Sequence, residues 1–344
     1  MGDERIVGTL RRPSNPGFRT SRLGSCKIPE VKIYLASPRG FCAGVDYAIE
    51  IVERALDRFG GRVFVRHEIV HNKQVVDRLR RMGAVFVEET DEIPEGETVV
   101  YSAHGVAPQV RGESRARSLR EIDATCPLVR KVHEESQRLA RDGYQILLIG
   151  HRGHVEVIGT FGEAPDRTTL IETLADAERV QVPDPTKVAY LTQTTLSVDD
   201  TAEIVTKLRE RFPAIVGPAR DDICYATQNR QNAVKELCRH VDCVLVVGDP
   251  HSSNSNRLVD VARREGLPAW LLQNAEQVPG LLDEARVALG RPIGAVGLTA
   301  GASAPADLID AVLAKLEALG GERADEIVTA REKIQFALPP SLRD

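Results

Sequence analysis

Short hydrophobic runs alternate along this chain with stretches in which apolar residues recur every three or four positions. The first pattern predicts buried strands, and the second predicts amphipathic helices. Because strands and helices follow one another in turn, we expect βα units with parallel sheets, which is an α/β fold. The predicted strands cover residues 31–37, 62–70, 84–88, 98–103, 144–150, 187–193, 243–248, 268–272 and 293–299.

The helical stretches between these strands carry start and stop signals. In residues 43–60, Val45, Ile49 and Val52 fall on one face, and the stretch ends in glycine, which is typical of a helix C-terminus. Residues 197–213 open with Ser and Asp and end at a proline, as a capped helix does. Further helices are predicted over residues 72–83, 126–143, 227–241 and 254–266.

Three cysteines, Cys42, Cys126 and Cys224, divide the predicted elements into three blocks of comparable size. The 344-residue length is enough for two or three domains. No sequence repeats at that spacing, so a pseudo-threefold arrangement is inferred from the order of the elements alone. The predicted organisation is a flexible N-terminal tail over 1–30, three small α/β domains over 31–43 with 224–311, 44–126 and 127–223, and a C-terminal wrapping segment over 312–344.

Composition and charge narrow the class of protein. Hydrophobic residues make up 42% of the chain and charged residues 28%, as in a globular protein. No apolar run approaches the roughly 18 residues needed to span a bilayer, and residues 1–30 have no apolar segment typical of a secretory signal. We therefore expect a cytoplasmic protein without a membrane partner. A net charge of −5 gives no basic footprint for nucleic acid.

The six cysteines favour metal or redox chemistry over disulfides. No C-x-x-C pair is present, which argues against a zinc ribbon or a ferredoxin-type cluster. Cys42, Cys126 and Cys224 lie in turns near strand ends, where parallel sheets present ligands. Three thiolates leave a four-iron cluster one ligand short, and an iron with an open position favours catalysis over electron storage. The alternative is that they are ordinary buried thiols, as we expect for Cys238 and Cys243.

Polar side chains of the types found in active sites follow almost every predicted strand. Each one alone is explained as a helix N-cap or a turn residue. Six such groups at the same end of successive strands are different, because they would converge on one cavity. The set comprises His71, Asn72, Ser102, His104, His151, His154, Glu156, Thr192, Thr194, Thr195, Ser252, Ser253, Asn254, Ser255, Asn256, Thr299 and Ser303.

The composition of this set predicts a small phosphorylated ligand. The chain has no Walker loop and no G-x-G-x-x-G after its first strand, so neither nucleotide motif is present. Histidines, small hydroxyls and amides at helix N-termini suit an anion. Glu156 is the only plausible carboxylate among them, and beside Thr194 it suits proton delivery; the alternative is a surface glutamate. His133 and His240 are expected on helix surfaces.

The motifs that carry these residues also occur together in a known family. They are PRGFCAGVDYAIEIVE, VRHEIVHNKQVVDRL, SAHGV, DATCPLV, GHRGHVEV, TQTTLSVDDT, RDDICYATQNRQ, SSNSNRL and TAGASAP. In combination they resemble the 4-hydroxy-3-methylbut-2-enyl diphosphate reductases, the terminal enzymes of the non-mevalonate isoprenoid pathway. The resemblance runs from about residue 31 to the end of the chain.

The resemblance implies three α/β domains in pseudo-threefold array around one central 4Fe-4S iron–sulfur cluster, held by Cys42, Cys126 and Cys224. It also implies that ferredoxin or flavodoxin, with its reductase, supplies the electrons. Thr194 and Glu156 would serve the substrate hydroxyl and proton delivery. The substrate diphosphate would be bound by His71, His104, His154, Ser252, Ser253, Asn254 and Ser303.

The implied reaction is reductive dehydroxylation, in which two electrons and protons remove the substrate hydroxyl as water and leave isopentenyl or dimethylallyl diphosphate. Two alternatives stay open. One is a redox-neutral iron–sulfur hydro-lyase that uses the open iron only as a Lewis acid, and the other is a non-catalytic iron–sulfur sensor that binds a diphosphate. The chain departs from the family at Val155, Ile158 and His251, which bears on rate or substrate preference and not on the class of reaction.

Overall fold

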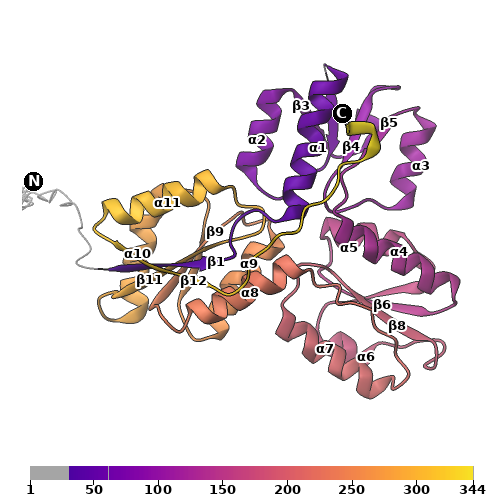
Figure 1. Ribbon diagram of the computed structural model, residues 1–344. Coiled ribbons are helices and arrows are strands. Elements are labelled where there is room, and N and C mark those ends of the chain that lie inside the picture. Colours follow the sequence, from indigo (N-terminus) through magenta and orange to yellow (C-terminus); the bar gives the residue numbers. More distant parts are fainter. Residues whose placement is uncertain (1–30, 61, 344) are drawn as a thin grey trace, which may run out of the picture.

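Three parallel β-sheets, each flanked by helices, form three lobes of the molecule (Figure 1). The structure is a computed structural model that describes residues 31–60 and 62–343. The tail expected over residues 1–30, which includes Cys26, lies outside the described residues. Every strand pair within the sheets of the described chain is parallel. This confirms the α/β fold predicted from the alternation of strands and helices.

The strands of each sheet come from separate parts of the chain. The first sheet has the order β10-β9-β11-β1-β12 and contains β1 (Lys32–Ser37), β9 (Cys243–Val247), β10 (Ala269–Leu272), β11 (Ala295–Ala300) and β12 (Glu322–Val328). The second has the order β3-β2-β4-β5 and contains β2 (Val63–Arg66), β3 (Ala84–Val87), β4 (Thr98–Tyr101) and β5 (Arg120–Asp123). The third has the order β7-β6-β8 and contains β6 (Gln145–Ile149), β7 (Thr168–Ile171) and β8 (Val188–Thr192).

The helices include all six that the apolar spacing predicts, namely α1 (Ala43–Phe59), α2 (Lys73–Met82), α4 (Pro127–Arg141), α7 (Val198–Arg211), α8 (Tyr225–Leu237) and α9 (Ser253–Arg264). The structure adds α3 (Pro108–Ala116), α5 (Val155–Gly162), α6 (Leu174–Arg179), α10 (Val278–Leu289) and α11 (Ala306–Ala318). Short 3-10 helices lie at Thr90–Glu92, Pro165–Arg167, Ala275–Gln277 and Pro340–Leu342.

The central strand β9 shows how a continuous apolar run fits a sheet that is covered on both faces. Its alternate residues Cys243, Leu245 and Val247 pack into a core with α10 and α11. The residues between them, Val244 and Val246, pack into a second core with α8 and α9. All five are fully buried, because successive side chains of a strand point to opposite faces. The apolar runs therefore marked the central strands correctly.

Three edge strands were missed because their sequences lack a continuous apolar run. β5 reads REID, β7 reads TTLI and β12 reads ERADEIV. Each pairs with one neighbour only within the described chain, so part of each strand faces solvent and tolerates charged or polar residues. In addition, the strand predicted over 62–70 ends at Arg66, and the residues beyond it form a turn.

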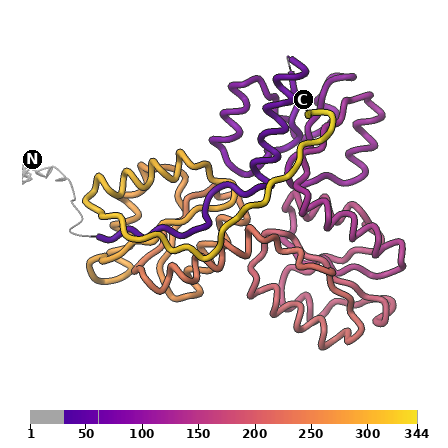
Figure 2. Tube along the Cα trace, viewed as in Figure 1, coloured from indigo at the N-terminus to yellow at the C-terminus, as the bar shows by residue number. Residues whose placement is uncertain are grey.

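The C-terminal segment connects two lobes. β12 pairs with β1 in the first sheet, and Figure 2 shows the chain then running from that lobe to the lobe of the second sheet. There Phe336, Leu338 and Leu342 join the core around α1. The helix α11 runs through residue 311, so the domain boundary predicted at that residue would cut a helix.

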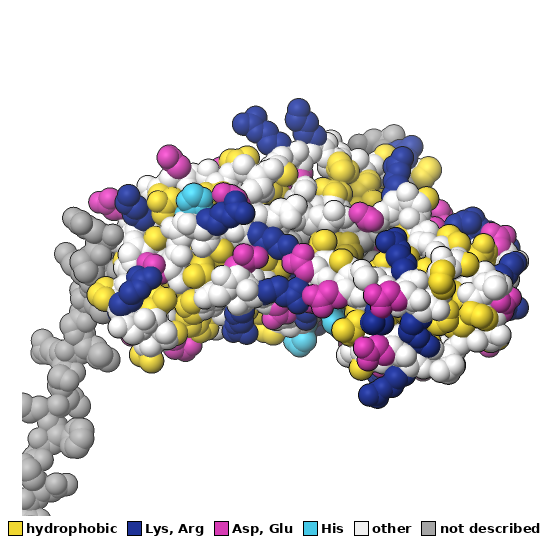
Figure 3. Space-filling view, turned by 90° about the horizontal axis from the view of Figure 1, so that it is seen from below, with side chains coloured by type: hydrophobic (Ala, Val, Ile, Leu, Met, Phe, Trp, Pro, Cys, Tyr) yellow, Lys and Arg dark blue, Asp and Glu magenta, His cyan; other side chains and the backbone are white. Residues whose placement is uncertain are grey.

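The surface of the molecule mixes charges of both signs. On the face seen in Figure 3, Lys and Arg side chains are interspersed with Asp and Glu side chains. Within residues 31–60 and 62–343, no helix is both long enough and apolar enough to cross a membrane.

Candidate active site

The three cysteines expected to act together occupy equivalent structural positions. Cys42, Cys126 and Cys224 are the N-cap residues of α1, α4 and α8. The first N–H groups of a helix have no partner within the helix and carry the positive end of its dipole. At Cys224 this is visible as hydrogen bonds, because the Thr227 N–H lies 3.4 Å from the sulfur and the Thr227 hydroxyl lies 3.2 Å from it. All three thiols line one cavity.

The three cysteines of this cavity are partly buried, and Cys126 packs closely against the first turn of α1. A Cβ atom on Gly44 would lie 2.6 Å from Sγ of Cys126 and 3.9 Å from Sγ of Cys42, so only glycine allows the first turn of α1 to meet Cys126. Burial, followed by the neighbouring thiols, raises the pKa of Cys126 to about 12 and that of Cys224 to about 11. Loss of water outweighs the helix N-termini here, so a bound cation would be needed to form the thiolates.

Three histidines form a second cluster in the same cavity. The His71 and His104 rings stack with centroids 4.3 Å apart, and the His154 ring meets them edge-on at 5.6 and 5.9 Å. Burial, reinforced by His71, lowers the pKa of His154 to about 4, and burial with both neighbours holds the pKa of His104 well below its usual range. Since Nδ1 of His154 accepts the Glu156 N–H at 3.2 Å, its Nε2 carries the proton and can donate to a ligand.

Small polar side chains at the N-terminus of α9 form a third cluster. Ser252 caps this helix, and its Oγ accepts bonds from the N–H of Ser255 at 3.2 Å and from the hydroxyl of Ser255 at 3.0 Å. The Asn254 side chain accepts the Ala302 N–H at 2.8 Å, and the Ser303 hydroxyl donates to the His71 carbonyl at 2.9 Å. The helix N-terminus, with hydroxyl and amide groups held in place around it, is suited to binding an anion.

Glu156 is the only carboxylate that lines the cavity within the described chain. It lies at the start of α5 and is 3% exposed, so the alternative of a surface glutamate is wrong. The Thr194 N–H donates to Oε1 at 2.6 Å, and the Thr194 hydroxyl donates to Oε2 at 3.0 Å. Burial raises the pKa of Glu156 to about 7 in spite of these bonds. A carboxyl group of this kind can hold a proton near neutral pH.

The cavity has a volume of about 100 Å³, and much of its remaining wall is apolar. Val45, Val70, Leu128 and Val129 contribute to it, so the site joins a polar, anion-binding end to a hydrocarbon surface. The residues that line the cavity and were named from the sequence as site residues are Cys42, Cys126, Cys224, His71, His104, His154, Glu156, Thr194, Ser252, Ser253, Asn254 and Ser303.

Two threonines of the wall were not named as site residues. Thr195 donates to Ser253 Oγ at 3.0 Å, and it was noted only as a residue that follows a strand. Thr227 accepts a bond from the Asn254 amide at 3.3 Å and contacts the Cys224 sulfur. Its position three residues after an N-cap cysteine was the signal that could have identified it.

An ion pair whose carboxylate is buried fixes the loop that leads to Cys224. Lys131 of α4 donates to Asp222 Oδ1 at 3.0 Å and also to the Arg220 carbonyl. The other oxygen of Asp222 accepts the Thr192 N–H at 3.0 Å. Burial raises the pKa of Asp222 to about 6 although Lys131 opposes the shift. The helix that begins at Cys126 therefore holds the loop that ends at Cys224.

His133 was expected on the surface, and this prediction is wrong. It is 4% exposed, and its Nδ1 lies 2.7 Å from Oε1 of Glu163. The ring lies on the buried face of α4 and packs against Gly105 and Gly159. It therefore contacts the turn after His104 and the helix that carries Glu156. His240 does lie at the surface, where its side chain is 45% exposed.

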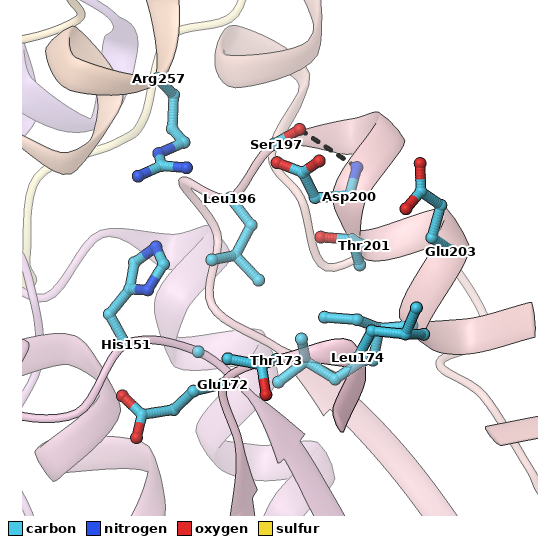
Figure 4. Close-up of a pocket in the computed structure, with 13 residues that line it drawn as sticks. His151, Glu172, Thr173, Leu174, Leu196, Ser197, Asp200, Thr201, Glu203 and Arg257 are labelled. Carbon is cyan, nitrogen blue, oxygen red and sulfur yellow. Dashed lines mark hydrogen bonds between the residues drawn. The ribbon is translucent and has the colours of Figure 1, made fainter. Parts of the chain in front are cut away.

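Other residues of the predicted set lie elsewhere. His151 lines a second cavity of about 270 Å³, where it and the Arg257 guanidinium point toward one another (Figure 4). Glu172 and Asp200 line the same cavity. Asn72 caps α2. Cys243 is buried, as expected, whereas Cys238 at the end of α8 is only partly buried.

The donor atoms of the site fit a cluster better than a single ion. Among the residues that the structure describes, no group of three or more His, Cys, Asp or Glu side chains is arranged to hold one metal ion. An iron–sulfur cluster binds each thiolate at a different iron, so its ligands need not converge on one point. Three soft thiols at helix N-termini suit such a cluster, since N–H groups near the sulfurs stabilise its negative charge.

Comparison with known proteins supports the resemblance seen in the motifs. A family model described as LytB protein matches residues 33–317. The 4-hydroxy-3-methylbut-2-enyl diphosphate reductase of Azoarcus sp. (strain BH72) is 56% identical over 313 residues, which cover 91% of this chain and 98% of that protein. The protein of the same name from Mycolicibacterium vanbaalenii is 51% identical over 332 residues, which cover 95% of this chain and 96% of that protein.

A solved structure has the same fold. The E-1-hydroxy-2-methyl-but-2-enyl-4-diphosphate reductase from Plasmodium falciparum is similar to this chain with a TM-score of 0.86 and 39% sequence identity. The similarity covers 91% of this chain and 97% of that chain. It confirms the arrangement of α/β units expected from the motifs.

Proposed function

The chain belongs to the LytB protein family, and we propose that it is a 4-hydroxy-3-methylbut-2-enyl diphosphate reductase, an iron–sulfur oxidoreductase of the non-mevalonate pathway. The substrate gains two electrons and two protons, loses its hydroxyl group as water, and becomes isopentenyl or dimethylallyl diphosphate. The observation that carries this proposal is a single cavity lined by three thiols, three histidines, a Ser/Asn cluster and one carboxyl group.

One 4Fe-4S cluster bound by Cys42, Cys126 and Cys224 is the cofactor in this proposal. When bound, it supplies electrons one at a time and an iron that acts as a Lewis acid on the substrate hydroxyl. Ferredoxin or flavodoxin, with its reductase, is the proposed electron donor. The apolar wall formed by Val45 and Leu128 excludes water beside the thiols.

The proposed site for the diphosphate lies among the histidines and the serine cluster. His71, His104 and His154 present rings to the same space as the N-terminus of α9. In the free protein, burial and mutual repulsion oppose the charging of His104 and His154. An anion between the rings removes that repulsion and favours their protonated forms. Ser252, Ser253, Asn254 and Ser303 complete the set of donors.

Glu156 is the proposed source of the proton that turns the leaving hydroxide into water. With its pKa raised to about 7, its carboxyl group can carry a proton at Oε2, and the protonated Oε2 would then donate to the Thr194 hydroxyl 3.0 Å away. Thr194 can pass a proton from this carboxyl to an oxygen bound in the cavity. Because the histidines hold the diphosphate, the hydrocarbon chain of the substrate is positioned for this transfer, and positioning of this kind supplies a large part of catalysis.

The test is an assay of anaerobically purified protein with the proposed substrate, with and without a reductant. Iron, acid-labile sulfide and the Mössbauer spectrum identify the cluster. We expect product formation that depends on the electron donor and yields one water per two electrons. Turnover without any donor would support the hydro-lyase, and diphosphate binding without turnover would support the sensor. Either result would contradict the proposal.

A further inference from the structure

Arg230 is a fully buried arginine that none of the steps above uses. It lies on α8, the helix that begins at Cys224, and its side chain is 0% exposed. Its Nη2 donates to the carbonyl oxygens of Gly40 at 2.7 Å and Phe41 at 3.1 Å, and its Nε donates to Gly40 at 3.2 Å. These two residues directly precede Cys42. The helix of one cysteine therefore holds the turn of another.

The counter-ion of Arg230 comes from the C-terminal segment. Glu332 Oε1 accepts from Nη1 at 2.9 Å, and Oε2 accepts from Nη2 at 3.3 Å. Oε1 also accepts from the Asn229 amide at 3.1 Å. Glu332 follows β12, on the stretch that runs between two lobes in Figure 2. The C-terminal segment thus reaches the base of the Cys42 turn.

The other side of the Cys42 turn is held by backbone hydrogen bonds. Gly40 N–H donates to the Ala300 carbonyl at 3.3 Å, and Cys42 N–H donates to the Ala302 carbonyl at 3.2 Å. With Arg230 bound to its carbonyl groups, the turn has hydrogen-bond partners for both its carbonyl and its N–H groups. A guanidinium suits this position because its planar fork can donate several hydrogen bonds at once.

The charge of Arg230 also acts on the Cys42 sulfur. The Arg230 guanidinium donates to the carbonyl groups of the two residues that directly precede Cys42, and Glu332, which is bonded to the same guanidinium, offsets part of its charge. A buried ion pair is weak as a source of stability, because both charges lose their water. A pair of this kind beside a ligand sulfur has a further effect, because hydrogen bonds and charges around the ligands tune a metal centre.

We propose that Arg230 is a positioning residue for Cys42 as a ligand of the cluster, and that Glu332 sets how much of the Arg230 charge acts on that cluster. The inference rests on the proposed function, since it assumes that Cys42 binds iron. It assigns a role to the C-terminal segment, which ties two lobes together and also supplies the counter-ion for the cluster site.

The two residues make opposite predictions for the reduction potential. Reduction adds an electron, so a nearby positive charge favours the reduced cluster and a negative charge disfavours it. Arg230→Met should lower the midpoint potential of the cluster, and Glu332→Gln should raise it. A purely structural role would loosen the site in both variants without shifting the potential in opposite directions.

The experiment measures midpoint potential by redox titration followed by electron paramagnetic resonance, and the rate of iron release to a chelator. Arg230→Met should release iron about tenfold faster or more, the usual scale for the loss of a group that orients a metal ligand. Arg230→Lys keeps the charge but loses the fork, so its potential should stay near that of the parent while its iron release is intermediate. If Arg230→Met does not fold, the midpoint potential of Glu332→Gln still tests the proposal: a rise supports it, and an unchanged potential contradicts it.

Arg211→Met is the matched control. Arg211 also donates to backbone carbonyls, including Val180 at 2.7 Å, but it lies on α7 and does not line the thiol cavity. We expect parent-like potential and iron release from this control. Equal values in Arg230→Met, Glu332→Gln and Arg211→Met would overturn the role of Arg230. If the parent protein itself contained no iron, the proposed cluster would be wrong, and the role of Arg230 inferred from it would fail as well.

Discussion

The side chain of Glu156 is joined to Thr194 through both carboxylate oxygens, to the Thr194 N–H at 2.6 Å and to the Thr194 hydroxyl at 3.0 Å. The N–H bond fixes the carboxylate. The hydroxyl bond can reverse, because a protonated Oε2 donates to Thr194 Oγ1 and leaves the hydroxyl proton free to point at a ligand. This pair therefore holds a proton in one state and passes it on in the other.

Glu156→Gln should reduce turnover by about 10²-fold or more, the usual scale for loss of a general acid. Glutamine keeps the size of the side chain but has no proton to give. The measurement is the steady-state rate with a chemical reductant, with iron content and substrate affinity expected to stay near those of the parent. Glu172→Gln is the control, because Glu172 lines the second cavity and should keep the parent rate. A Glu156→Gln enzyme at more than about half the parent rate would mean that the proton comes from another group.

The rate of the parent enzyme should fall as pH rises above about 7. The pKa of Glu156 is raised to about 7, so its acid form is present below that pH and is lost above it. A bound diphosphate adds negative charge and moves this loss to higher pH. The measurement is kcat at saturating substrate across pH, which reports the enzyme–substrate complex and leaves out the pH dependence of diphosphate binding. In Glu156→Gln this alkaline limb should be absent, and an unchanged limb in that variant would assign it to another group.

The sequence located the interior strands and the edge strands β3, β8 and β10, but it missed the edge strands β5, β7 and β12. β9 is buried on both faces and reads as a continuous apolar run, whereas β12 is largely exposed and reads ERADEIV. A pattern of hydrophobic residues indicates which residues are buried. The conformation of β12 depends on backbone pairing with β1 more than on burial, so its sequence gives little indication of a strand. The same reasoning explains β5 and β7.

The sequence predicted most of the polar residues that line the cavity, but it did not predict the residues that support the cavity from behind. Residues such as Cys42 and His104 could be grouped because each follows a predicted strand, although their strands, β1 and β4, belong to different sheets. Arg230 could not, because its partner Glu332 is remote in sequence and burial of an arginine runs against its residue type. His133 could have been identified, since it falls on the helix face marked by Val129 and Val132.

Substitution of the cysteines should separate ligands from core residues. Cys42→Ser, Cys126→Ser and Cys224→Ser should each lose most of the bound iron, because a serine hydroxyl is a poor substitute for a thiolate at iron. Cys238→Ser is the matched control, since Cys238 is a helical cysteine outside the cavity. Iron and acid-labile sulfide per chain are the measurements. Full retention of iron in any of the three variants, or loss of iron in Cys238→Ser, would contradict the assignment of the cluster ligands.

Diphosphate binding should take up protons. The pKa of His154 is lowered to about 4 in the free protein, and that of His104 is also low, so both are neutral at pH 7. A bound anion raises these values, so affinity for inorganic diphosphate should increase as pH falls from 8 to 6. Titration calorimetry in buffers of different ionisation enthalpy measures the uptake. His104→Ala should bind diphosphate more weakly while its iron content stays normal. If the parent protein instead contained stoichiometric zinc that His104→Ala lost, the histidines would be metal ligands and not diphosphate ligands.

Gly105 should tolerate no side chain, for two reasons that can be separated. Its φ is +80°, a conformation that costs an alanine about 1 kcal/mol. In addition, a Cβ would lie 2.8 Å from Cε1 and 3.0 Å from Nε2 of His133, a clash that adds about 1–3 kcal/mol. Gly96 has a φ of +79° and no atom within 4 Å of such a Cβ, so Gly96→Ala measures the backbone cost alone.

Urea unfolding should therefore show a larger loss of stability for Gly105→Ala than for Gly96→Ala, and the difference is the cost of the contacts with His133 and, at 3.3 Å, with Cγ2 of Thr125. Because the turn carries His104, Gly105→Ala should also weaken diphosphate binding, whereas Gly96→Ala should leave it unchanged. Adding His133→Ala to Gly105→Ala removes the clash and should restore binding in part, since the ring no longer displaces the turn. Equal losses of stability in the two glycine variants would show that His133 yields freely and does not hold the His104 turn in place.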